Sequence, residues 1–115
     1  MIEITIIQYL GRLLENVPVL AERPEEPDPT YVLIERVGSD VRNHISYATI
    51  AIQSYGPTLL AAAELNERVE TAMAEITDLT DISRCELNSS YNYTDTETKE
   101  YRYQAVFDLT YMKGA

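Results

Sequence analysis

The sequence contains no tryptophan and only one phenylalanine, one histidine and one cysteine in 115 residues. The single cysteine, Cys85, excludes a disulfide within the chain. One histidine with one cysteine cannot form a structural zinc site of nitrogen and sulfur ligands. No base is spaced to activate Cys85 as a nucleophile, and a lone cysteine in a strand-like segment is most often a small core hydrophobe.

Glycine is also scarce, and none of the four glycines lies in a phosphate-binding loop or a nucleophile elbow. The acidic segments EEPD (25–28) and DLTD (78–81) offer a hard cation only weak sites, because neither has the alternating spacing of a calcium loop. We therefore predict that the chain is not an enzyme and that it holds neither a cofactor nor a metal.

Long apolar runs are missing as well, and none approaches the roughly 20 residues that a membrane span requires. The N-terminal segment MIEITIIQYLGRLLEN carries an acid at Glu3 and lacks the basic start of a signal peptide. We expect a protein that is made in a cytoplasm and has no membrane partner.

Basic residues are outnumbered, with nine Lys and Arg against 19 Asp and Glu and a net charge of −10. Such a chain is repelled at long range by nucleic acid and by anionic membrane surfaces. Two functional explanations stay open here: an acidic wall along which DNA slides without sticking, and a mimic of DNA. The third explanation is solubility alone.

What the sequence does contain is apolar material for one core, at 45% hydrophobic residues. Apolar periodicity predicts a helix at 2–15, a short edge strand at 18–22 and a second helix at 57–77. Alternating or β-rich segments predict four more strands, at 30–38, 45–55, 82–93 and 100–112. We expect a single domain (1–115) of the α+β class, two-layered, with a mainly antiparallel sheet, two helices and the order α-β-β-β-α-β-β.

The segments between these elements are predicted to be surface turns. RPEEPDP at 23–29 has three prolines and three acids, which is typical of a Pro-rich surface loop. SDVRNH at 39–44 and TDTETK at 94–99 are predicted to be turns that each join two strands. The strand at 45–55 is apolar on both faces, so we expect it at the centre of the sheet and covered on both sides.

Five of the nine tyrosines lie in SSYNYTDTETKEYRYQAVFDLTYM (89–112), within the predicted C-terminal hairpin 82–112. A period of two places them on the apolar side of both strands, with Phe107 at the inner end. We therefore predict a cross-strand aromatic ladder made of Tyr91, Tyr93, Tyr101, Tyr103 and Tyr111.

This ladder has two explanations that the physical argument leaves open. Tyrosine offers apolar area with a polar tip and is enriched at protein interfaces. The same tyrosines can equally cap the core with their hydroxyls in solvent. In both cases the opposite face of the hairpin, with Arg102, Gln104 and Asp108, meets solvent or a partner.

Two segments carry a resemblance to a known family, RNHISYATIAIQSYGPTLLAAAELNERVETAMAEI (42–76) and SSYNYTDTETKEYRYQAVFDLTY (89–111). They combine a strand ending in IQSY, a helix with AAELNERV, a short acidic turn and a hairpin. The N-terminal helix and VPVLAERPEEPDPTYVLIERVG fit in order and length. The pattern resembles the tail terminator, or head-to-tail joining, proteins of long-tailed bacteriophages, which are small neck and tail-completion proteins.

The resemblance implies a virion structural protein that assembles into a homo-oligomeric ring, typically a hexamer, at the top of the tail tube. Such a ring ends tube polymerisation, contacts the tail tube protein and the head connector or adaptor proteins, and lets phage DNA pass through an acidic lumen. It implies localisation in the tail or neck of the virion after assembly in the host bacterial cytoplasm. No catalytic residues come with this family.

Ring assembly is heterologous, so one patch on each subunit meets a different patch on the next. We expect these contacts at the outer end of the C-terminal hairpin and at the SDVRNH turn, with the Pro-rich loop as a further candidate. The predicted subunit-interface residues are Tyr91, Tyr93, Tyr101, Tyr103, Asp40, Arg42 and His44.

Two other classes of function compete with this one. The first is an acidic binding module, a DNA mimic or an inhibitor, which the charge favours. The interleaving of acids with Arg and Lys in DTETKEYR weakens it, because a mimic needs carboxylates in rows at phosphate-like spacing. The second is a small enzyme or ligand-binding domain, which lacks visible site chemistry.

Overall fold

The computed structural model describes residues 1–112, which form two helices, a short 3₁₀ helix and five strands. The helical elements are α1 (Ile2–Leu13), α2 (Leu59–Met73) and the 3₁₀ helix η1 (Ile76–Asp78). The strands are β1 (Val19–Leu20), β2 (Tyr31–Arg42), β3 (Ile45–Gly56), β4 (Ile82–Asn92) and β5 (Tyr101–Met112). The predicted α+β class and the order α-β-β-β-α-β-β are confirmed.

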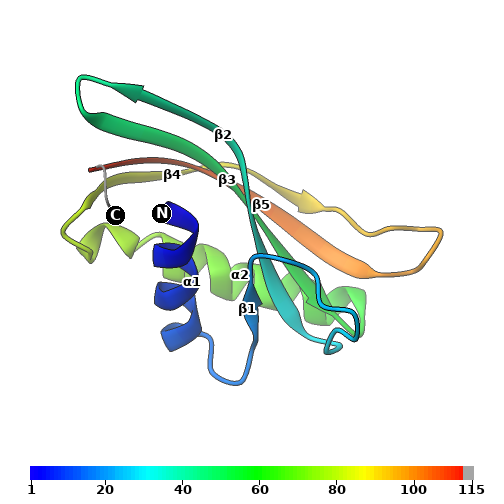
Figure 1. Ribbon diagram of the computed structural model, residues 1–115. Helices are drawn as coiled ribbons and strands as arrows, with labels where there is room; N and C mark the ends of the chain where they lie inside the picture. Colours follow the sequence, from blue (N-terminus) through cyan, green and yellow to red (C-terminus); the bar gives the residue numbers. More distant parts are fainter. Residues whose placement is uncertain (113–115) are drawn as a thin grey trace.

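The strands form one sheet in the order β1-β2-β3-β5-β4. Only β1 and β2 pair in parallel; the other neighbours are antiparallel, so the sheet is mainly antiparallel as predicted. The two-residue β1 lies at one edge, where Pro18 before it accepts the Val32 N–H at 2.9 Å through its carbonyl. Both α1 and α2 lie on one side of the sheet, which gives two layers (Figure 1).

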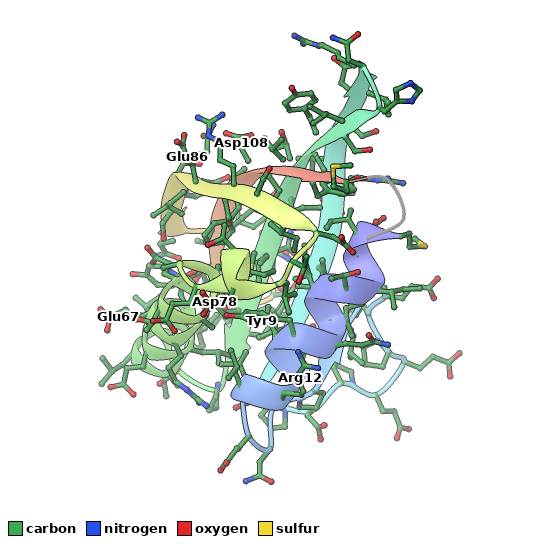
Figure 2. The ribbon with its side chains drawn as sticks, turned by 90° about the vertical axis from the view of Figure 1, so that its left-hand side faces the viewer. Tyr9, Arg12, Glu67, Asp78, Glu86 and Asp108 are labelled. Atoms are coloured by element: carbon green, nitrogen blue, oxygen red, sulfur yellow. The ribbon has the colours of Figure 1, made fainter. Side chains whose placement is uncertain are left out.

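The core fills the space between the helices and the sheet. Its members from both layers are at most 2% exposed and include Ile6, Leu10, Val69, Met73, Ile50, Ile52, Phe107 and Leu109. Burying each such side chain contributes about 1.5–3 kcal/mol. Tyr9 of α1 adds a polar tie, because its hydroxyl donates to the Ala72 carbonyl of α2 at 2.6 Å, and Figure 2 shows Tyr9 directed toward that helix.

The second helix begins two residues later than predicted. Thr58 is its N-cap and accepts the Ala61 N–H through its side chain at 3.0 Å, so Pro57 precedes the cap. Gly56 makes this tight entry possible, because a Cβ there would lie 2.7 Å from the Ala62 nitrogen. The sequence GPT thus ends a strand and starts a helix over three residues.

The prediction of a turn at 39–44 is wrong, because β2 continues to Arg42 and pairs there with Ile45. Only Asn43 and His44 form the turn, with φ values of 51° and 68°. A two-residue hairpin turn of this kind requires positive φ at both central positions. The polar sequence was misleading because this end of the hairpin projects past the helices, and both of its faces meet solvent (Figure 1).

The central strand is β3, between β2 and β5, as predicted, but the expectation of cover on both sides is only half right. Helices cover the face with Ile52, and none covers the face with Gln53 and Tyr55. Those two residues are nevertheless only 7% and 4% exposed. Large side chains of the neighbouring strands take the place of a helix layer there.

Candidate functional site

The candidate site is the open face of the sheet, defined as the side of β2, β3, β4 and β5 that points away from the helices. Strand alternation puts Tyr55 and Gln53 of β3 and Arg102 and Gln104 of β5 on this face, because Phe107 and its same-side neighbours enter the core. Figure 2 shows Glu86 and Asp108 on this side of β4 and β5. Arg102, Gln104 and Asp108 point away from the helices, as predicted, but Gln104 is buried and does not meet solvent.

A bulge in β4 changes the expected placement of the tyrosines. The pairing with β5 slips by one residue between Leu87 and Ser89, which reverses the facing of every later side chain in the strand. The predicted five-tyrosine ladder is therefore wrong. It is divided into two groups, Tyr91 and Tyr93 on the open face and Tyr101, Tyr103 and Tyr111 on the helix side.

One end of the open face is closed by a stacked pair of tyrosines. Tyr31 of β2 and Tyr55 of β3 are register partners, and their rings lie 4.2 Å apart at an interplanar angle of 7°. The pair is almost fully buried. Burial, followed by repulsion from Tyr55, raises the pKa of Tyr31 to about 12.

A chain of hydrogen bonds runs from this pair across three strands. The Tyr55 hydroxyl donates to Gln53 Oε1 at 3.2 Å, and Gln53 Nε2 donates to Gln104 Oε1 at 2.8 Å. Gln104 Nε2 then donates to the Tyr91 hydroxyl of β4. Both buried amides have hydrogen-bond partners, so this series of hydrogen bonds fixes the position of the Tyr91 side chain.

Arg102 joins the two ends of this chain. Its Nη1 donates to the Tyr55 hydroxyl at 3.1 Å, and its Nε donates to the Tyr93 carbonyl at 2.7 Å. The guanidinium also lies 4.5 Å from the centre of the Tyr93 ring, within cation–π range. Tyr93 in turn meets Tyr91 edge to face, with ring centres 6.0 Å apart.

We call this assembly the tyrosine cluster. Its members are Tyr31, Gln53, Tyr55, Tyr91, Tyr93, Arg102 and Gln104. Tyr91 and Tyr93 remain 41% and 42% exposed, although their positions are fixed from below. Amphipathic rings that are ordered before contact lose little conformational entropy on binding, so the cluster is suited to protein association.

The middle of the open face is polar and carries charges of both signs. Asp108 accepts from Thr49 Oγ1 at 2.9 Å and from Asn88 Nδ2 at 3.0 Å. Arg84 and Glu86 form an exposed ion pair at 2.5 Å. The ion pair cancels one charge of each sign, and Asp108 is bonded to neutral donors.

The other end of the open face leads into the projecting hairpin, which we call the arm (residues 37–45, all exposed). Arg42 Nε donates to Asp40 at 2.8 Å, and its guanidinium lies 5.6 Å from the centre of the Tyr47 ring. The hydrogen bond from Arg42, with a second from the Val41 N–H, holds the pKa of Asp40 below its usual value.

The seven predicted interface residues therefore fall into three places. Tyr91 and Tyr93 belong to the tyrosine cluster, whereas Tyr101 and Tyr103 are half-buried on the helix side. Asp40, Arg42 and His44 lie in the arm, about ten β3 residues away, or roughly 30 Å along the strand. The structure thus brings the tyrosines of β4 together with Arg102, and it does not bring them near the arm.

Sequence reasoning missed Tyr31, Tyr55 and the paired amides as members of the site. A signal existed for the tyrosines, since each stands in a predicted strand of the first hairpin. Nothing local pairs Gln53 with Gln104, which lie 51 residues apart. That contact depends on strand register, which sequence alone did not supply.

Cys85 lies half-buried against the core, as the sequence predicted for a small hydrophobe. Burial, followed by the nearby Asp108, raises its pKa to about 11. The thiol therefore stays protonated and poorly nucleophilic at neutral pH.

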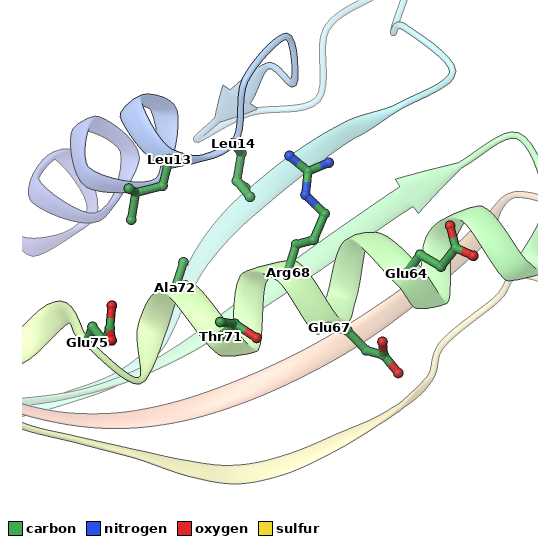
Figure 3. Close-up of a pocket in the computed structure, with 8 residues that line it drawn as sticks. All are labelled: Leu13, Leu14, Glu64, Glu67, Arg68, Thr71, Ala72 and Glu75. Atoms are coloured by element: carbon green, nitrogen blue, oxygen red, sulfur yellow. The ribbon is translucent and has the colours of Figure 1, made fainter.

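A groove of about 570 Å³ lies on the opposite side of the molecule, between the C-terminal end of α1 and α2. It is lined by Leu13, Leu14, Glu64, Glu67, Arg68, Thr71, Ala72 and Glu75, and we call it the helix groove. Figure 3 shows Leu13 and Leu14 on its α1 side and Arg68 and Ala72 directed toward them from α2. Leu13 is 51% exposed, which is unusual for a leucine beside a core.

Within residues 1–112, no group of three or more His, Cys, Asp or Glu side chains is placed to hold a metal ion. Over the same residues, no helix has the length and apolar character needed to cross a membrane.

Comparison with known proteins assigns no family to this chain. No protein-family model matches the chain, and no curated protein matches it.

Proposed function

We propose that this chain is a structural subunit of the neck of a long-tailed bacteriophage, of the tail terminator or head-to-tail joining type. It assembles into a ring that caps the tail tube, contacts the head connector and leaves a hole for DNA. The observation that carries the proposal is the open face, with a tyrosine cluster that is ordered yet half-exposed at Tyr91 and Tyr93. The resemblance of residues 42–76 and 89–111 supplies the biological setting.

The distribution of charge supports the same function. Between residues 64 and 81, on α2 and the segment after it, six acids stand against one base: Glu64, Glu67, Glu70, Glu75, Asp78 and Asp81 against Arg68. On the open face, by contrast, Arg84 forms an ion pair with Glu86, and Arg42 forms one with Asp40. A subunit that turns the acids outside the helix groove, Glu70, Asp78 and Asp81, to a central hole repels DNA there and keeps it moving.

The test is to image phage particles made without this protein. Tails of uncontrolled length support a terminator, and tails of normal length that fail to join heads support a joining protein. Normal infectious particles would contradict both.

A complementation experiment separates the open face from the fold. The double variant Tyr91→Ala with Tyr93→Ala should fold, because both rings are half-exposed, and should fail to restore infectious particles. The matched control is Ala21→Ser with Glu22→Gln, at two exposed positions before the Pro-rich loop, and it should restore them. Full activity of the tyrosine variant would remove the open face from the proposal.

One observation favours a second function, that of an acidic binding module. Glu64, Glu67 and Glu75 are exposed, and none forms an ion pair within residues 1–112. Free carboxylates along one helix are what a DNA mimic presents to a nuclease. Inhibition of a DNA-binding enzyme at micromolar concentration, relieved by added DNA, would support this function over the ring.

A further inference from the structure

We infer that copies of this chain associate head to tail, with the arm of one copy inserted into the helix groove of the next. The inference rests on the proposed function for the ring that such contacts would close. The contact itself is inferred from this chain alone, from a projecting tip with exposed apolar side chains and the unused donors of Arg42, and from an acidic groove with an apolar floor.

The inserting element is the arm tip, residues 41–45. Val41 and Ile45 are 60% and 36% exposed, and they point to opposite faces of the hairpin, since Val41 pairs with Ser46 and Ile45 with Arg42. The Nε of Arg42 is bound to Asp40, while its terminal nitrogens have no hydrogen-bond partner within residues 1–112. The tip therefore presents apolar side chains on both faces and unused donors on a fixed guanidinium.

The arm is also ordered without a partner. Its strands pair up to the last residue before the turn, and the Arg42 guanidinium of β2 lies over the Tyr47 ring of β3. A rigid projecting hairpin loses little entropy when it docks. The arm is thus a preformed insert with two exposed apolar side chains.

The receiving element is the helix groove. Its floor is apolar, with Leu13, Leu14 and Ala72, and its charged residues are three glutamates and Arg68. Leu13 lines this groove from α1, and Glu75 lines it from the segment after α2 (Figure 3), so the groove offers an acid and an apolar side chain to an arm that carries an arginine and apolar side chains. A groove of about 570 Å³ is large enough for the side chains of a hairpin tip.

The other hairpin turn does not fit this groove. The turn between β4 and β5, residues 94–99, carries Asp95 and Glu97 against one lysine and has no exposed large apolar side chain. The acidic groove would repel it. Charge and apolarity together therefore select the arm among the two projecting turns.

The positions of tip and groove determine the kind of assembly. The arm is the end of the β2–β3 hairpin at the upper left of Figure 1, and the C-terminal end of α1 lies at the bottom of the same view. A contact between two separate patches can repeat from copy to copy, and it then closes into a ring or extends as a filament. A two-fold dimer would instead require each arm to enter the groove of the other copy at the same time.

Disulfide trapping tests the contact directly. In a Cys85→Ser background, Ile45→Cys and Leu13→Cys proteins are prepared separately, mixed and oxidised. We expect the mixed 45–13 disulfide to form at least tenfold more than the 45–45 or 13–13 product. Glu22→Cys, at an exposed position before the Pro-rich loop, is the matched control and should not trap with either protein. Equal yields of all pairs, or no mixed product at the highest soluble concentration, would overturn the inference.

Charge exchange gives a second, independent measurement. By sedimentation, Arg42→Glu and Glu75→Arg should each raise the dissociation constant of self-association about tenfold, and the two changes in one chain should restore it. Glu22→Arg is the control and should leave the dissociation constant unchanged. Failure of the double variant to recover, with circular dichroism showing an intact fold, would count against the contact.

The outcomes keep this inference apart from the proposed function. Rings that form normally without the 45–13 disulfide would overturn the arm contact and leave the neck protein standing. If the 45–13 disulfide forms but phage particles made without the protein are normal, the arm contact stands and the proposed neck function is contradicted.

Discussion

At the residue scale, two buried tyrosines differ in what their hydroxyls bond. The Tyr9 hydroxyl donates to a buried carbonyl between the helices, whereas the Tyr31 hydroxyl has no hydrogen-bond partner within residues 1–112. Both rings are packed, so their phenylalanine variants change the polar group alone. The pair therefore separates the contribution of the hydroxyl from that of the ring.

We expect Tyr9→Phe to lower the free energy of unfolding by about 1–2 kcal/mol, because a buried carbonyl loses its donor. Tyr31→Phe should change it by less than about 0.5 kcal/mol, since no bond is lost and a buried hydroxyl is removed. Urea unfolding of both variants measures the difference. A larger loss in Tyr31→Phe than in Tyr9→Phe would show that the Tyr31 hydroxyl is bonded after all.

Tyr31 also makes the free energy of unfolding depend on pH in the alkaline range. Burial raises the pKa of Tyr31 from 10.0 to about 12, so between these values the folded chain holds a proton that the unfolded chain releases. The contribution to stability is complete below pH 10 and is lost as pH rises toward 12. When the free energy of unfolding is measured with urea at pH 9, 10 and 11, it should fall less steeply with pH in Tyr31→Phe than in the wild type. Identical declines would exclude Tyr31 as a source of it.

At the element scale, substitutions of two glycines, one inside α1 and one before α2, should change stability in opposite directions. Gly56→Ala places a Cβ 2.7 Å from the Ala62 backbone nitrogen and should destabilise the fold by about 1–3 kcal/mol. Gly11→Ala, inside α1 with no atom within 4 Å, should stabilise it by about 0.5–1 kcal/mol. Thermal unfolding of both variants gives the signs. A stabilising Gly56→Ala would mean that the α2 entry can shift without loss.

The arm should be less protected than the strands that continue from it. It packs against no helix, whereas residues 48–54 of the same hairpin lie over the core. In a dilute sample, we expect backbone amides of residues 38–44 to exchange hydrogen at least tenfold faster than those of 48–54. Equal protection would indicate that the arm is covered even in the free chain.

Elements that depend on residues close together in the sequence were predicted, whereas features that depend on contacts between distant segments were not. Period and capping residues are local, so the helices, the strands and their order were predictable. The bulge between Leu87 and Ser89 left no mark in the alternation of Tyr91 and Tyr93, because both phases of that strand look equally plausible. The turn at 39–44 was misassigned because exposed strand residues are as polar as turn residues.

The candidate site was predictable only in part for the same reason. The outward face with Arg102 and Gln104 followed from alternation around Phe107, a residue that must enter the core. The chain of bonds through Gln53 did not, since it joins three strands whose register is set by tertiary pairing. Local pattern thus predicts which way a strand faces, provided that no bulge intervenes.

At the scale of the whole molecule, charge is divided between the two layers. The helix layer concentrates free acids on α2, whereas the open face of the sheet carries Arg84 and Arg102 together with acids, and Arg84 is paired with Glu86. This division gives the chain one side that is predominantly acidic and another that carries charges of both signs. A protein partner can then approach the sheet without crossing a strong repulsive field.

We expect the purified protein to show no binding to double-stranded DNA, because its net charge of −10 leaves no cationic surface large enough to displace counterions. Fluorescence anisotropy with a labelled duplex, at protein concentrations up to about 100 μM and at low and physiological salt, measures this. Binding that weakens steeply with salt would reveal a basic surface and contradict an acidic channel wall.

The arm described above has a consequence for how this protein can change over evolutionary time. Its strands hold one another and contribute almost nothing to the core, so new side chains at residues 41–45 leave the rest of the molecule intact. Substitutions can therefore accumulate at the tip while the chain still folds. Grafting the tip of one such protein onto another should then transfer the choice of neighbour along with it.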